Sequence, residues 1–128
     1  MSGGPMVFEY ALVRVVPRLE RGEQVNAGVI VYCQSARFLE ARCSLDADRL
    51  RAIDPGVDVE GVHRALEAVR RVCRGGVEAG PARTEAQGAR FRWLTAPRST
   101  IVQPGPIHSG LTVDPAAELD RLAGSLVG

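Results

Sequence analysis

VFEYALVRVV, residues 7–16, is rich in β-branched and aromatic side chains and ends at a proline, which is typical of a β-strand. The nearly unbroken apolar run VNAGVIVYC at residues 25–33 favours a central strand that is covered on both faces. RFLEARCSL at residues 37–45 alternates in polarity, as a third strand would. Because short connections join antiparallel neighbours, these three runs predict an antiparallel meander over the first 45 residues.

Helical patterns replace the strand pattern after this meander. Residues 46–53 predict a short helix, and residues 59–74 predict a longer one that begins at the cap Asp58 and packs across the strands. A further helix over residues 116–126 is signalled by the pair Asp114-Pro115, a cap followed by proline at the first helical position. Strands followed by helices predict an α+β fold, with an antiparallel sheet and helices packed on one face.

The bulk composition fits one soluble domain over residues 1–128, with residues 1–5 as a frayed leader. A net charge of +1 disfavours broad nucleic-acid binding. The basic side chains other than the histidines are all arginine, which excludes a Schiff-base lysine. Neither a secretory signal nor a membrane segment is visible. Three cysteines without CxxC spacing predict reduced thiols and a cytoplasmic protein: Cys33, Cys43 and Cys73.

The stretch RFRWLTAPRSTIVQPGPIHSGLT, residues 90–112, is the most informative for function. It lies in a region without acidic residues between Glu85 and Asp114. Its three prolines predict an irregular segment, with a short strand at residues 91–94. We expect Trp93 to be buried and to anchor this segment, so that Trp93→Ala costs about 3 to 5 kcal/mol.

An anion site is predicted around Arg98. A guanidinium followed by two hydroxyl side chains suits a phosphate or a carboxylate, because arginine binds it in bidentate fashion while neutral donors fill the remaining lone pairs. In the alternative, Arg98 pairs with Glu23 or Glu40 of its own chain. The predicted anion-binding residues are Arg21, Arg92, Arg98, Ser99 and Thr100, with Glu23, Asn26 and Gln103 in support at one end of the sheet.

Catalytic and metal-binding motifs are not recognisable. The sequence has no GxGxxG, P-loop, HExxH or GxSxG pattern, and its two histidines and scattered cysteines do not form a zinc motif, so we expect neither a metal nor a cofactor. We interpret His63 as a residue at the border of a helix without chemistry. His108 is a candidate general acid or base for a phosphorylated or nucleotide substrate, with Arg98 and Arg92 stabilising charge. In a loop, however, a lone histidine is more often structural.

Two motifs together indicate a family. ERGEQVNAGVIVYC (residues 20–33) and FRWLTAPRSTIVQPGPIHSGLTVDP (residues 91–115) resemble a bacterial family labelled domain of unknown function 3037 (DUF3037). The resemblance covers essentially the whole chain and implies that the two motifs belong to one site. It implies no activity, and it suggests a HipA-like kinase as a candidate protein partner.

Three functions are therefore considered. The first is a non-catalytic binding or accessory module whose arginine-rich loop engages an anionic group on a protein or a small molecule. The second is a small enzyme that uses His108. The third is a weak single-stranded nucleic-acid binder, which the charge balance disfavours but the arginines beside Trp93 keep under consideration.

Overall fold

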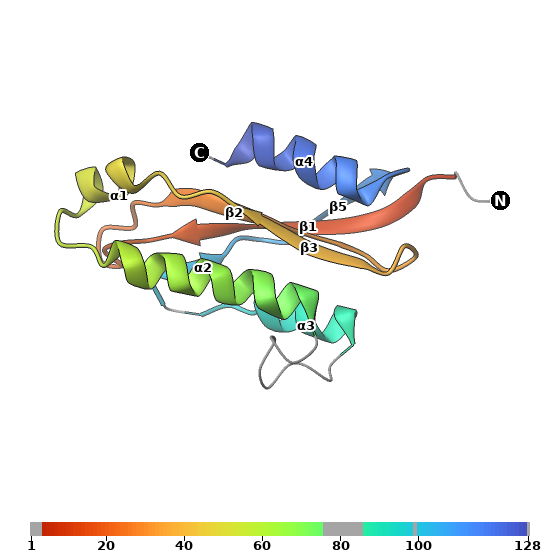
Figure 1. Cartoon of the computed structure of the whole chain (residues 1–128), viewed down its shortest axis with the longest axis horizontal. Coiled ribbons are helices and arrows are strands. Elements are labelled where there is room, and N and C mark those ends of the chain that lie inside the picture. The colour runs from red at the N-terminus through yellow and green to blue at the C-terminus, as the bar shows by residue number, and fades with distance from the viewer. Residues whose placement is uncertain (1–3, 76–85, 99, 128) are drawn as a thin grey trace.

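A computed structural model describes residues 4–75, 86–98 and 100–127. Figure 1 shows a sheet between helices. Within the described residues, no helix is long and apolar enough to cross a membrane. In chain order the elements are β1 (Met6–Val15), β2 (Val25–Cys33), β3 (Phe38–Cys43), α1 (Ala47–Ile53), α2 (Val59–Arg74), α3 (Gln87–Leu94), β4 (Val102–Pro104), β5 (His108–Thr112) and α4 (Pro115–Leu126).

The described strands form one antiparallel sheet. β1 pairs with β2, and β2 pairs with β3, which confirms the predicted meander and the α+β class. On the other side of β1, β4 lies along its second half and β5 along its first half. The long predicted loop therefore supplies two strands. Its prolines limit β4 to a short segment, because proline has no backbone N–H for a sheet ladder.

Helices cover both faces of the sheet, which corrects the expectation of one covered face (Figure 1). On one face, α2 and α3 pack on a core that includes Val25, Ile30 and Leu39. On the other face, α4 packs over Val29 and Val31. The reason lies in β2, whose side chains are apolar on both sides, so that a second helix is needed to exclude water from the second side.

The predicted strand at residues 91–94 is wrong, because these residues form the end of α3. No side chain caps the first turn of this helix, so the usual signal for a helix start is missing. A helix and a strand bury different side chains of this segment. A strand would place Phe91 and Trp93 on one face, whereas the helix buries Phe91 with Leu94 and turns Trp93 outward.

Arg90 connects α3 to the end of α2 and belongs to the fold. It is buried and donates to the carbonyl of Cys73 over 3.4 Å. Gly75 ends α2 with a φ of 74°, and a Cβ built at this position would lie 2.7 Å from an Arg90 nitrogen. A glycine thus lets the guanidinium approach the carbonyl end of α2, where the helix dipole favours a cation.

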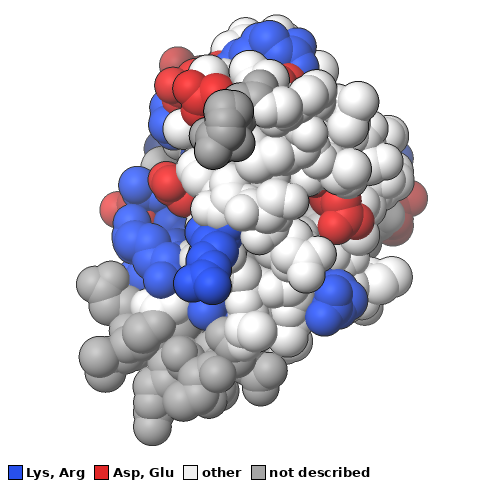
Figure 2. All heavy atoms as spheres, turned by 90° about the vertical axis from the view of Figure 1, so that its right-hand side faces the viewer, with Lys and Arg blue, Asp and Glu red and all other residues white. Residues whose placement is uncertain are grey.

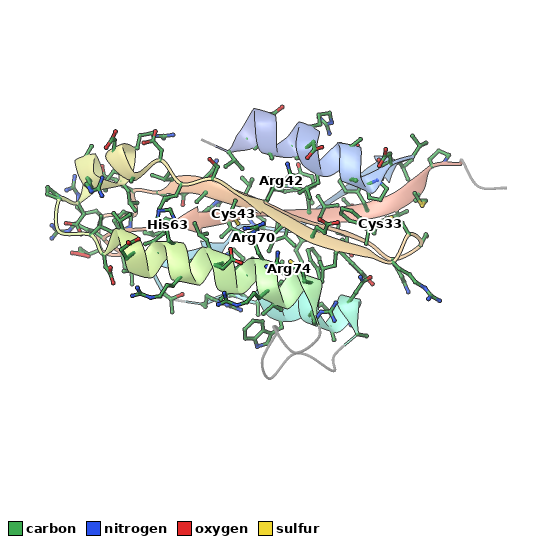
Figure 3. The ribbon with its side chains drawn as sticks, viewed as in Figure 1. Cys33, Arg42, Cys43, His63, Arg70 and Arg74 are labelled. Atoms are coloured by element: carbon green, nitrogen blue, oxygen red, sulfur yellow. The ribbon has the colours of Figure 1, made fainter. Side chains whose placement is uncertain are left out.

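The three cysteines are free thiols, and two of them have strongly raised pKa values. Burial raises the pKa of Cys43 to about 11 and that of Cys73 to about 12, from an ordinary value of 9. Figure 3 shows Cys43 on the sheet, with Arg70 and Arg74 along α2. Both thiols are therefore protonated at neutral pH and are poor nucleophiles.

These thiols should make the fold sensitive to alkali. Each raised pKa contributes stability that is complete below pH 9 and is lost as the pH rises toward 11 to 12, because the unfolded thiol ionises first. We expect the free energy of unfolding to fall by about 2 kcal/mol per thiol between pH 9 and 11. Urea titrations of wild type, Cys43→Ala and Cys73→Ala measure this slope. An equal slope in all three proteins would contradict the assignment.

Candidate functional site

A groove of about 460 Å³ runs between α2 and the segment that follows α3. Along α2 it extends from Asp58 to Val72, roughly 21 Å of helix. Its lining is almost entirely apolar on the α2 side and gains polar groups from the facing segment. The lining residues are Asp58, Gly61, Val62, Ala65, Ala68, Val69, Val72, Trp93, Leu94, Arg98, Thr100, Ile101 and Val102.

Small side chains on α2 help to shape the groove. Gly61, Ala65 and Ala68 recur at spacings of four and three residues, which places them on one side of the helix. Larger apolar residues would fill the same space. Leu66 lies on the buried side of α2 and packs in the core instead, so the helix presents one stripe to the core and a neighbouring one to the groove.

Trp93 lies at the groove and is 55% exposed, which corrects the expectation that it is buried. Ile101, also in the lining, is exposed as well. Two large apolar side chains in contact with solvent beside a concave apolar surface are typical of a binding site. Trp93 is also the single tryptophan of the chain, so its fluorescence reports on this groove alone.

Arg98 lies half-buried in the groove, with its guanidinium over the Trp93 ring. The Cζ atom is 5.1 Å from the ring centroid, and one terminal nitrogen donates to the carbonyl of Trp93. The alternative ion pair with Glu23 or Glu40 is not formed in the described part of the chain, where Glu23 pairs with Arg21 over 2.9 Å. A guanidinium has five N–H donors, and among the described residues one hydrogen bond uses a terminal nitrogen, which leaves further donors for a ligand.

Thr100 and Gln103 are the predicted site residues that the structure brings near Arg98. Thr100 lines the same groove and donates through its hydroxyl to the carbonyl of Val102 over 2.7 Å. Gln103 and Arg98 together line a second, small cavity of about 20 Å³, whose lining includes Val13 and Ile30 of the sheet. Ser99 lies outside the described residues.

Other predicted members lie elsewhere. Arg21 pairs with Glu23 in the exposed turn between β1 and β2. Asn26 donates to the carbonyl of Leu126 over 3.1 Å and thereby holds the end of α4 on the opposite face of the sheet. Arg92 is exposed on α3 and does not line the groove within the described residues. Of the two sequence motifs, only the second, residues 91–115, contributes residues to the lining of the groove.

His108 is separated from Arg98 by the sheet. It is exposed on β5, and its ring lies 5.1 Å from that of Tyr10, its cross-strand partner. Tyr10 packs with the cluster under α4, whereas Arg98 faces α2. An imidazole in this position is not within reach of an anion held by Arg98. His63 is exposed on the outer side of α2.

The α2 wall of the groove, formed by Gly61, Ala65 and Ala68, was not predicted from the sequence. A stripe of glycine and alanine at helical spacing gives no chemical signal. Within the described residues, no three His, Cys, Asp or Glu side chains gather as metal ligands.

A family model described as "Protein of unknown function (DUF3037)" matches residues 10–127, nearly the whole chain, which confirms the resemblance inferred from the two motifs. No curated protein and no solved structure matches the chain.

Proposed function

We propose that this chain, which belongs to the DUF3037 family, is a binding module whose groove takes a slender apolar molecule that ends in one carboxylate or phosphate. The observation that carries the proposal is the position of Arg98. It contributes a cation to a groove that is otherwise lined mainly by apolar side chains, and no carboxylate pairs with it in the described part of the chain.

The size and lining of the groove favour this class of ligand. A volume of about 460 Å³ lies in the ordinary range of small-molecule sites, roughly 300 to 1,000 Å³. The apolar length of α2 would bury an aliphatic or aromatic body, while the guanidinium of Arg98 would hold the anionic end. The acid in the lining, Asp58, is engaged as the cap of α2 and lies near Arg64.

The packing of Arg98 on Trp93 prepares the site for an anion. Stacking on an aromatic face holds the planar guanidinium in one orientation, so less freedom is lost when a ligand binds. Charge-assisted hydrogen bonds contribute about 1.5 to 3 kcal/mol each. We place the activity in the cytoplasm, which the three free thiols support.

Tryptophan fluorescence tests the proposal directly. We expect octanoate and octyl phosphate to change the emission of Trp93 in a saturable manner, and 1-octanol to bind at least about tenfold more weakly, because it lacks the charge. Inorganic phosphate alone should bind poorly because it buries no apolar surface. An emission change with a short oligothymidine but none with octanoate would refute the proposal and favour stacking of bases on Trp93.

A further inference from the structure

β5 is an edge strand of the sheet in the described part of the chain. It pairs with β1 on one side, and no other described strand pairs with its outer side. The helices pack elsewhere: α4 lies mainly on β2 and β3, and α2 lies mainly on β3. The outer backbone N–H and C=O groups of β5 therefore form an open ladder, which is a template for a further strand.

β5 lacks the features that usually protect such an edge. Its sequence HSGLT contains no Lys, Arg, Asp, Glu or Pro, the residues that commonly prevent pairing. The opposite edge, β3, differs in this respect because it contains Glu40 and Arg42. Arg42 also pairs with Asp120 of α4 over 2.7 Å, so a charged contact crosses that edge.

Exposed apolar side chains adjoin the open edge. Val7 and Leu111 are cross-strand partners, and they are 62% and 66% exposed, while Val113 just beyond β5 is 65% exposed. Figure 2 shows a broad uncharged area on the end of the molecule where β1 begins and β5 ends. An apolar cluster beside an unpaired strand indicates an interface.

We propose that β5 pairs antiparallel with β5 of a second copy of this chain, so that one sheet runs through both copies. Antiparallel pairing of a strand with itself is complementary by symmetry, because each residue meets the same partner in both directions. With Gly110 opposite Gly110, Asp114 of each copy faces Pro106 of the other. The two acidic residues thus lie at opposite ends of the interface, and no like charges of the strands oppose each other.

Substitution of Leu111 provides the test. Sedimentation velocity should show a dimer of the wild-type chain, and Leu111→Lys should raise the dissociation constant of that dimer at least about tenfold. Leu111 points to solvent, so the lysine should leave the fold intact, which circular dichroism checks. Leu19→Lys is the matched control, because Leu19 is exposed in the turn between β1 and β2 and should leave the dimer unchanged.

Hydrogen exchange locates the interface independently of any substitution. The amides of residues 108–112 should become more protected as the wild-type concentration rises, while those of β3 should not change. A wild-type chain that stays monomeric at high micromolar concentration would overturn the proposal, even if an extended peptide bound to the edge. A dimer that persists in Leu111→Lys without protection of residues 108–112 would also overturn it, because another surface would then hold the copies together.

Discussion

Phe91→Ala should lower the free energy of unfolding by about 3 to 5 kcal/mol. Phe91 is 1% exposed and lies between α3 and the sheet, where its ring is 5.3 Å from that of Tyr32. Removal of the ring leaves a cavity under α3, because the rigid sheet cannot close over it. Since the segment after α3 forms one side of the groove, this residue also supports the candidate site. Urea denaturation monitored by circular dichroism measures the change.

Trp93→Ala is the matched control for this measurement, two residues away on the same helix. Trp93 lies on the outer side of α3 and is mostly exposed, so its loss should cost less than about 1 kcal/mol. If both substitutions destabilised the fold equally, Trp93 would be part of the core and the groove as described would not exist.

Ala65→Phe should strongly weaken ligand binding while it preserves the fold. Ala65 lines the groove from the middle of α2 and is partly exposed, so a phenyl group there would occupy the space of the ligand without entering the core. We expect the affinity for octanoate to fall by at least about a hundredfold, roughly 2.7 kcal/mol. The emission of Trp93 should meanwhile report contact with the new ring.

The control for this substitution is Ala52→Phe. Ala52 is exposed on α1 and does not line the groove, so the same chemical change there should leave octanoate binding unaltered. Octanoate binding that survives Ala65→Phe would show that the ligand lies elsewhere on the molecule.

The meander, α2 and the start of α4 could be predicted because local signals agree at each of them. The caps Asp58 and Asp114 accept backbone N–H groups from Gly61 and Ala117, as their positions in the sequence suggest. The apolar run of β2 indicates that both faces of the sheet are covered. The face on which α4 packs, however, depends on the path of the chain after β5, which no local pattern specifies.

The candidate site was predicted only in part, for a physical reason. Charge drew attention to Arg90, Arg92 and Arg98 together, because one sequence stretch contains all three. Arg90 and Arg92 lie on α3 and point in different directions: Arg90 is buried against the end of α2, and Arg92 is exposed. Arg98 follows the helix and reaches the groove. The α2 wall opposite it comes from distant residues whose role depends on tertiary packing.

The central claim is that Arg98 selects the anionic end of a ligand in the groove. Calorimetric titration of octanoate and 1-octanol into wild type, Arg98→Gln and Arg121→Gln tests it, with Arg121 as an exposed arginine paired with Glu118 on α4. We expect Arg98→Gln to reduce the preference for octanoate over 1-octanol at least about tenfold and Arg121→Gln to leave it unchanged. An unchanged preference in Arg98→Gln, or equal binding of both ligands by the wild type, would contradict the claim.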